Sequence, residues 1–504
     1  MGRHKMERSS IILILAFSVA IVVISLLIGL WAKRKANTAQ AFFGGTGMFG
    51  PVAVGLASMS GIASAFAVVG VPGIIYSTGN AMTFWMLSGA AFAMSYLILG
   101  KKVRAIAEIA PISSLGDICD LRFNNNRWIK GVMSLVICLG CISYLAAQIS
   151  AGSTMFSHLL GFPPIVTGLI IFGILTIYTA ISGEVGGILT QAFQGFIMVL
   201  SSIAMLIAFV SITGGFGNIL KAVGSISEVA NADGSVVKKL GPDFLNAWGI
   251  MPKNISLTWM LIPILGCVGQ PQVLTRIYAV KDPRDLPKAG IVTAISHTIV
   301  GFVAVTTAYG ALYLVATGKV APFVKGDLAF YVFSDYAGVT IQLLGYAAVL
   351  AAAMSSASMF LTSTSTLLSK DLPSALGISI NPKKQINISR TFMVVLGLVS
   401  IVVSIYSSEM VAILGTFGWG TLVSGTFPVF IIGLLWERAN EKGVLTGMIV
   451  SFILNVLSLA KFKWPGGLPA YVSITAISVA LTIFVSLLTR KQQLSENMRE
   501  VIRL

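Results

Sequence analysis

Charged residues are scarce in this chain. Only 10% of its 504 residues are Asp, Glu, Lys or Arg, 56% are hydrophobic, and the mean hydropathy is +0.89. A water-soluble protein of this length needs a far more polar surface. The composition therefore excludes an ordinary soluble domain and predicts an all-α polytopic membrane protein.

Cysteine is also rare. The four residues Cys119, Cys138, Cys141 and Cys267 all lie in or beside apolar segments, so we expect no extracellular disulfide framework. The CLGC motif at 138–141 has the spacing of a metal or redox pair. Two thiols one helical turn apart in an apolar segment are, however, more often packing residues.

Carboxylates are missing from the positions where a proton pathway needs them. All 18 Asp and Glu residues fall in loops or at the ends of apolar segments, and only His297 lies deep in one. Intramembrane proton carriers usually place a titratable group at a span centre, and a lone histidine is more often packed or hydrogen-bonded. The sequence also has no HExxH motif, no GxSxG elbow and no facing pair of carboxylates. We therefore expect no enzyme and no proton relay.

Apolar windows of about 20 residues mark the predicted membrane spans. The first window is interpreted as a retained span, because its apolar core is longer than that of a signal peptide and no small-residue cleavage site follows it. The thirteen windows are 10–32, 50–76, 80–100, 130–156, 163–182, 187–213, 254–278, 288–316, 338–368, 388–407, 410–436, 443–461 and 469–489.

The basic residues predict the orientation of these spans. One of the two alternating sets of loops carries 23 of the 34 Lys and Arg residues, and the richer set faces the cytoplasm. This places the N-terminus outside and the C-terminus, with the tail 490–504, inside a bacterial-type plasma membrane. The net charge of +16 then reflects contact with anionic membrane lipid, and no nucleic-acid partner is expected.

The longer connections between spans are predicted to hold short helices or a gate. The longest outer segment, 212–252, has room for one or two short helices, and 317–337 has room for another. The largest cytoplasmic connection is 101–130, which looks like a gate or an anchor.

Hydroxyl groups replace charge inside one of the spans. The stretch AAAMSSASM at 351–359 places Ala352, Ser355 and Ser356 on one helical face. A longer stripe of Ser355, Ser358, Thr362, Ser365 and Ser369 continues towards the cytoplasmic end. Hard cations prefer such oxygen ligands, although serines in membrane helices also bond back to the preceding turn and allow close packing.

Two other spans are interrupted at corresponding positions. The span at 50–76 contains Ser58, Ser60 and Gly61 in its first half, and the span at 254–278 contains Gly266, Gly269 and Pro271. They begin two successive five-span units, 50–213 and 254–436. Interrupted helices at matching positions are typical of inverted-repeat transporters, in which unwound carbonyls hold a cation and half-helix N-termini face an anionic group.

Four motifs together resemble the sodium:solute symporter family. They are GPVAVGLASMSGIASAFAVVGVPG at 50–73, GQPQVLTRIYAVKD at 269–282, AAAMSSASMFLTSTSTLLSKDL at 351–372 and FPVFIIGLLWERANEKGVLTGMIVS at 427–451. The resemblance covers nearly the whole chain. It implies a leucine-transporter-like 5+5 inverted repeat with one extra N-terminal span, 10–32, and two extra C-terminal spans, 443–489.

The resemblance also implies a sodium site. Its ligands would be the carbonyls of Ser60, Ala63 and Ala352 and the hydroxyls of Ser355 and Ser356. A second site in some members uses an aspartate in a pattern like WTDVIQ, where this chain has LTQAFQ with Gln191. Met359 also stands where another hydroxyl would serve. We therefore expect one sodium ion.

The resemblance indicates the substrate less precisely than it indicates the ion. GQPQVLTR is similar to the branch that carries proline, pantothenate and short monocarboxylates, in which a histidine follows GQP, but Gln272 takes its place here. For Trp85 and Trp419 a position at the lipid interface is an equal alternative to the cavity wall. The expected cavity is lined by Ser58, Met59, Trp85, Tyr144, Gln148, Cys267, Gln270 and Trp419.

The predicted function is sodium-coupled import of a small organic solute by alternating access, with the chain working as a monomer. Alternatives on the same fold are a sodium-independent or proton-coupled carrier and a passive channel. A membrane sensor would need an attached signalling domain, for which the tail after Thr489 is too short.

Overall fold

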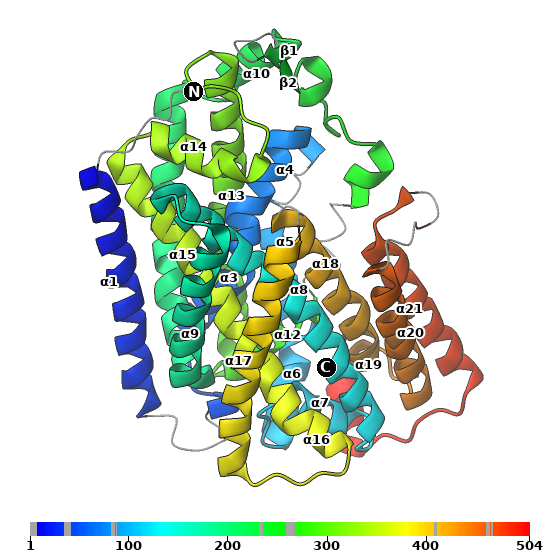
Figure 1. Ribbon diagram of the computed structural model, residues 1–504. Coiled ribbons are helices and arrows are strands. Elements are labelled where there is room, and N and C mark those ends of the chain that lie inside the picture. Colours follow the sequence, from blue (N-terminus) through cyan, green and yellow to red (C-terminus); the bar gives the residue numbers. More distant parts are fainter. Residues whose placement is uncertain are drawn as a thin grey trace.

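The protein is a bundle of long helices in a computed structural model (Figure 1). The structure describes residues 8–34, 42–81, 86, 88–230, 235–258, 266, 268–407, 411–459, 464 and 467–504. Within these residues ten helices are long and apolar enough to cross a membrane, or eleven if one bent pair is a single span. The all-α membrane architecture is therefore as expected.

The expected number of thirteen spans is not reached in the described part of the chain. At 80–100 the structure has only an 11-residue helix, α5 (Ser88–Ile98), and most of the first half of the span at 254–278 lies outside the described residues. The second half of that span is the short helix α12 (Pro271–Ala279). Neither of these short helices is long enough to cross a membrane, so such segments are not among the ten.

The first five-span unit contains the bent pair. Helix α3 (Pro51–Ile62) stops at Ala63, and the chain resumes at an angle of 55° through the π-helical turn η1 (Phe66–Gly70) and α4 (Val71–Thr78). After α5 come α6 (Gly100–Ile109), α7 (Leu115–Arg122), α8 (Arg127–Leu160) and α9 (Pro164–Thr213).

Helix α9 contains two predicted spans, which meet at Gly183. This glycine has φ +56°, and a Cβ on it would come within 2.7 Å of the Phe42 ring. Only glycine meets both conditions without strain. The kink places Glu184 at the start of the second span, Gly183–Thr213.

The second unit and the C-terminal helices complete the bundle. Helix α15 packs on α9, α18 packs on α8, and α20 and α21 pack on each other. The elements are α13 (Leu286–Ala316), α14 (Ala329–Tyr336), α15 (Val339–Thr366), the π-helical turn η6 (Leu367–Asp371), α16 (Leu372–Ala375), α17 (Pro382–Tyr406), α18 (Val411–Thr426), the π-helical turn η7 (Phe427–Ile432), α19 (Gly433–Leu435), α20 (Glu441–Leu459), α21 (Ala470–Leu488) and α22 (Glu496–Arg503).

The two ends of the bundle differ. One end, here called the α10 end, holds α10 (Phe216–Gly224), α14 and a hairpin of β1 (Glu228–Ala230) and β2 (Val236–Lys239) (Figure 1). The opposite end, the α7 end, holds α6, α7, α16 and the C-terminus. The short helices expected at 212–252 and 317–337 are present as α10 and α14, whereas the hairpin has no counterpart in the sequence-based prediction.

The outer helices present apolar side chains outwards. Helix α1 (Arg8–Lys33) exposes Leu27 by 59%, and α21 exposes Phe484 by 60%. Such surfaces are stable against lipid chains and not against water. The buried interior, by contrast, contains many hydroxyl and amide side chains, and these define the candidate site.

Candidate functional site

The serines of α15 lie against the broken end of α3. The Oγ of Ser355 donates to the carbonyl oxygen of Ser60 at 2.7 Å, and the Oγ of Ser356 donates to the carbonyl oxygen of Gly61 at 2.9 Å. Ser356 also lies 3.4 Å from the carbonyl oxygen of Ser60, and Ser355 lies 3.2 Å from that of Ala352. All of these residues are buried.

The helix break makes those carbonyl oxygens available. In a continuous helix the N–H groups of Ser64 and Ala65 would bond the carbonyls of Ser60 and Gly61. Here the Ser64 N–H bonds the carbonyl of Ile62 at 2.8 Å, and the Ala65 N–H bonds Oε1 of Gln148 at 2.9 Å. The two carbonyls therefore turn to the serines of α15.

This cluster has the chemistry of a sodium site. It offers neutral carbonyl and hydroxyl oxygens from two helices, which suit a hard monovalent cation. Four of the five expected ligand residues, Ser60, Ala352, Ser355 and Ser356, come together, while Ala63 is the non-helical residue that ends α3, with ψ 68°. A bound cation would take the carbonyl lone pairs that the serine hydroxyls now use.

A buried network with charged side chains adjoins this cluster and was not predicted from the sequence. The Oγ of Ser60 donates to the carbonyl oxygen of Gln191 at 2.7 Å. The side chain of Gln191 donates to the Oγ of Ser358 at 3.0 Å and accepts from Nη2 of Arg276 at 2.6 Å. Arg276 is completely buried and forms an ion pair with Glu184. The available signal was an arginine directly after the motif GQPQVLT, within an apolar stretch.

Three of the residues predicted to bind substrate support the broken helix in this structure. The Oγ of Ser58 lies 2.5 Å from the hydroxyl of Tyr96, and Tyr144 lies 2.7 Å from the Oγ of Ser64. Gln148 accepts the N–H of Ala65, as described above. Tyr144 and Gln148 therefore hold the break in place, whereas Ser58 joins α3 to α5.

Met59 is separated from this group. Its Cε lies 3.2 Å from the position of a Cβ built on Gly195 of α9, so its side chain is directed towards α9. Trp85 and Cys267 lie outside the described residues. The structure therefore brings Tyr144 and Gln148 to the break, places Ser58 against Tyr96 of α5 and directs Met59 towards α9.

Trp419 and two glutamines carry buried polar atoms with no hydrogen-bond partner in the described part of the chain. These atoms are Nε1 of Trp419 and both amide atoms of Gln270 and of Gln272. Buried polar groups of this kind usually meet a ligand or water. The Trp419 ring lies 5.8 Å from that of Tyr144 and 6.1 Å from that of Phe92, so Trp419 is an interior residue and not an interfacial one.

A cavity of about 380 Å³ adjoins Trp419 between α18 and α21. Its walls are mostly apolar and include Val423, Tyr471 and Val479. The predicted substrate residue Trp419 lines this cavity together with Gly266, whereas Ser58 and Gln148 do not line it.

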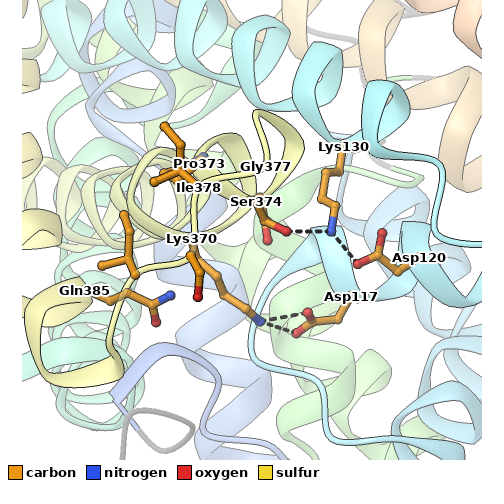
Figure 2. A pocket seen from close by; sticks show the side chains of 12 residues that line it. Asp117, Asp120, Lys130, Lys370, Pro373, Ser374, Gly377, Ile378 and Gln385 are labelled. Carbon is orange, nitrogen blue, oxygen red and sulfur yellow. Dashed lines mark hydrogen bonds and ion pairs between the residues drawn. The ribbon is translucent and has the colours of Figure 1, made fainter.

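A second cavity, of about 410 Å³, lies at the α7 end (Figure 2). Two ion pairs flank it: Lys370 of η6 lies 2.7 Å from Asp117 of α7, and Lys130 of α8 lies 2.5 Å from Asp120. The first pair joins the end of the α15 helix to α7. Both pairs therefore tie together elements that meet only at this end of the bundle.

Comparison with known proteins places this geometry in a family. The sequence model of the Sodium:solute symporter family matches residues 42–451. The osmoregulated proline transporter OpuE of Bacillus subtilis is 26% identical over 488 residues, covering 92% of this chain and 93% of its own. The sodium/pantothenate symporter of Escherichia coli is 26% identical over 483 residues, covering 92% and 94%.

A solved structure shares the fold. A sodium-coupled sialic acid symporter, in a substrate-bound outward-open state, superimposes with a TM-score of 0.75 at 19% identity. The match covers 96% of this chain and 99% of that one. The expected leucine-transporter-like arrangement of helices is thereby supported over almost the entire chain.

Proposed function

The chain belongs to the sodium:solute symporter family, and from this premise we propose that it imports a small organic solute by coupling it to the inward movement of sodium. It is a transporter and not an enzyme. The observation that carries the proposal is the contact of Ser355 and Ser356 with the carbonyls of Ser60 and Gly61. Neutral oxygens from two helices meet there at a helix break, as ion-coupled transporters of this architecture require.

Sodium binding would couple the two halves of the protein. The carbonyls of Ser60 and Ala63 lie at the end of α3 in the first unit, whereas the carbonyl of Ala352 and the two hydroxyls belong to α15 of the second. A cation between them replaces direct hydrogen bonds with stronger interactions to a charge, and so favours the arrangement in which α3 lies against α15. The same break is held by Tyr144 and Gln148, which links the ion site to the proposed substrate residues.

The proposed substrate is an amino acid or a small carboxylic acid. OpuE is a proline transporter and the second relative is a pantothenate symporter. In this chain Gln270, Gln272 and the Trp419 indole offer hydrogen-bonding groups that lack partners among the described residues. Helix α12 begins at Pro271 with Gln270 as its N-cap, and the positive end of a helix dipole favours a carboxylate.

We further propose that the α7 end faces the cytoplasm. The loops at that end carry most of the basic residues, as expected for a cytoplasmic surface. The C-terminus lies there and α1 starts at the opposite end (Figure 1). In this orientation the chain is a multi-pass plasma-membrane protein that works as a monomer in contact with anionic lipid.

The decisive experiment is uptake by purified protein in proteoliposomes. We expect labelled solute to accumulate when a sodium gradient is imposed and not when potassium replaces sodium. Accumulation driven equally well by a proton gradient would favour a proton-coupled carrier. Equilibration without accumulation, in either salt, would favour a passive channel.

A thermal-unfolding screen should identify the solute before uptake is measured. Purified protein is heated with amino acids, short carboxylates, pantothenate and sugars, each with and without sodium. We expect stabilisation by one class of solute that is larger when sodium is present, because a ligand that binds the folded state raises its stability. Stabilisation by a sugar alone would contradict the proposed carboxylate class.

A further inference from the structure

Glu184 and Gln191 lie on the same face of α9, seven residues and about two helical turns apart. Both contact Arg276 of α12: Glu184 through an ion pair and Gln191 through a hydrogen bond of 2.6 Å. The Arg276 side chain is 0% exposed and that of Glu184 is 3% exposed. A single buried guanidinium is therefore shared by two side chains of one helix.

A buried guanidinium needs a carboxylate nearby, because an uncompensated charge in the interior is strongly destabilising. In the described part of the chain, the carboxylate that contacts Arg276 is that of Glu184. Gln191, the other side chain of α9 that contacts Arg276, supplies only a neutral amide oxygen. The negative charge that neutralises Arg276 on this face of α9 is therefore that of Glu184.

This network joins three helices next to the proposed sodium site. Thr362 of α15 donates to Oε2 of Glu184 at 3.0 Å, and Ser358 of α15 accepts from Gln191. Residues 358 and 362 follow Ser355 and Ser356 along α15 towards the α7 end. The groups that a sodium ion meets next on that side are thus Ser358, Thr362, Glu184 and the guanidinium that neutralises Glu184.

We propose that Glu184 and Arg276 together form a gate between the sodium site and the α7 end. The proposal rests on the sodium-coupled function proposed above. Glu184 is a positioning residue in this scheme: it holds Arg276 against Gln191 and thereby keeps α9, α12 and α15 together. Release of sodium towards the α7 end requires the guanidinium to move aside.

The test is to move the negative charge from position 184 to position 191. Glu184→Gln leaves Arg276 without a counter-charge, and we expect sodium-driven uptake to fall by about tenfold or more, given the cost of breaking a buried pair. Glu184→Gln combined with Gln191→Glu restores one carboxylate, because the new oxygen stands where Gln191 Oε1 already accepts from Arg276. We expect the double variant to regain most of the uptake. Asp335→Asn, which removes a partly buried carboxylate at the other end of the bundle, is the matched control.

Thermal unfolding separates this proposal from the proposed function. We expect Glu184→Gln to unfold at a lower temperature and the double variant to recover, whether or not a transported solute is known. We also expect sodium to raise the unfolding temperature of both variants, because the serine ligands are intact. Wild-type uptake and stability in Glu184→Gln would overturn the proposal. So would a double variant that recovers neither, including one that does not fold. Absence of sodium-dependent uptake in the unmodified protein, with stability still recovered in the double variant, would instead overturn the transport function alone.

Discussion

The Oγ of Ser355 donates a hydrogen bond of 2.7 Å to the carbonyl oxygen of Ser60, across the interface between α15 and the broken end of α3. The two residues are 295 positions apart in the chain. Neither residue is charged, and both are fully buried. A cation held between them would need no carboxylate for its coordination, which distinguishes sodium coupling from proton coupling.

Removing the serine hydroxyls should weaken the response to sodium. For Ser355→Ala and Ser356→Ala we expect the half-saturating sodium concentration of uptake to rise by about tenfold, because a bond from a neutral oxygen to a charge contributes about 1.5–3 kcal/mol. Sodium activation curves in proteoliposomes measure this effect. Ser202→Ala is the control, since Ser202 bonds back to the carbonyl of Met198 at 2.6 Å in α9. Unchanged sodium activation in a variant that carries both substitutions would show that the two serines contribute only to helix packing.

Gln272 should affect the binding of the solute and not the binding of sodium. Both of its amide atoms lack a partner among the described residues although the side chain is buried. We expect Gln272→Ala to raise the KM for solute by about fivefold, the effect of one lost hydrogen bond, with the half-saturating sodium concentration unchanged. Gln342→Ala, near the α10 end, is the control. A change in sodium activation with an unaltered solute KM would contradict this role.

The ion pair between Lys370 and Asp117 should hold the α7 end closed (Figure 2). Asp117 also accepts the N–H groups of Ser113 and Ser114 at the start of α7, so Lys370 is the residue to change. We expect Lys370→Met to raise the labelling rate of a cysteine placed at the buried Thr366 by about fivefold, since a half-buried pair contributes about 1 kcal/mol. Lys383→Met, at an exposed position, should leave the rate unchanged. Equal rates in both variants would show that the pair does not restrain this end.

Local features of the sequence were sufficient to single out Ser60, Ser355 and Ser356, which the structure brings together at the helix break. The interruption of the span at 50–76 follows from Ser60 and Gly61, and the alignment of Ser355 with Ser356 follows from helical periodicity. Both depend on neighbours in the chain. The break in the structure falls at Ala63, two residues after Gly61, so even its position was nearly predicted.

Relationships between distant segments were not predictable in the same way. Arg276 and Glu184 are 92 residues apart, and nothing in either segment indicates which carboxylate reaches the guanidinium. The direction of Met59 towards Gly195 depends equally on how α3 packs on α9. The hairpin of β1 and β2 consists of short, partly polar strands whose pairing is decided by the fold around them.

A buried carboxylate near the α10 end should make stability depend on pH. Burial raises the pKa of Asp327 above its ordinary value, and Oδ1 has no hydrogen-bond partner among the described residues. The folded protein then binds a proton at a pH at which the unfolded chain has lost it, so stability rises as the pH falls through the raised pKa and levels off below the ordinary value. We expect the unfolding temperature of the wild type to rise relative to that of Asp327→Asn on acidification from pH 8. Asp243→Asn, at an exposed carboxylate, is the control, and parallel curves for the wild type and Asp327→Asn would contradict the expectation.

One sodium ion should move in each transport cycle. The side-chain oxygen of Gln191 carries no charge and is already bonded to Arg276 at 2.6 Å, while Met359 stands where a hydroxyl would be needed. A second cation beside the first would face the positive charge of both the bound sodium and the guanidinium in a poorly solvated site. We therefore expect a Hill coefficient for sodium of about one, since a single ion is bound without a carboxylate partner. Reversal-potential measurements on reconstituted protein give the coupling ratio directly, with measurements at several imposed sodium gradients as internal controls. A ratio of two sodium ions per solute would show that position 191 accepts a cation despite Arg276.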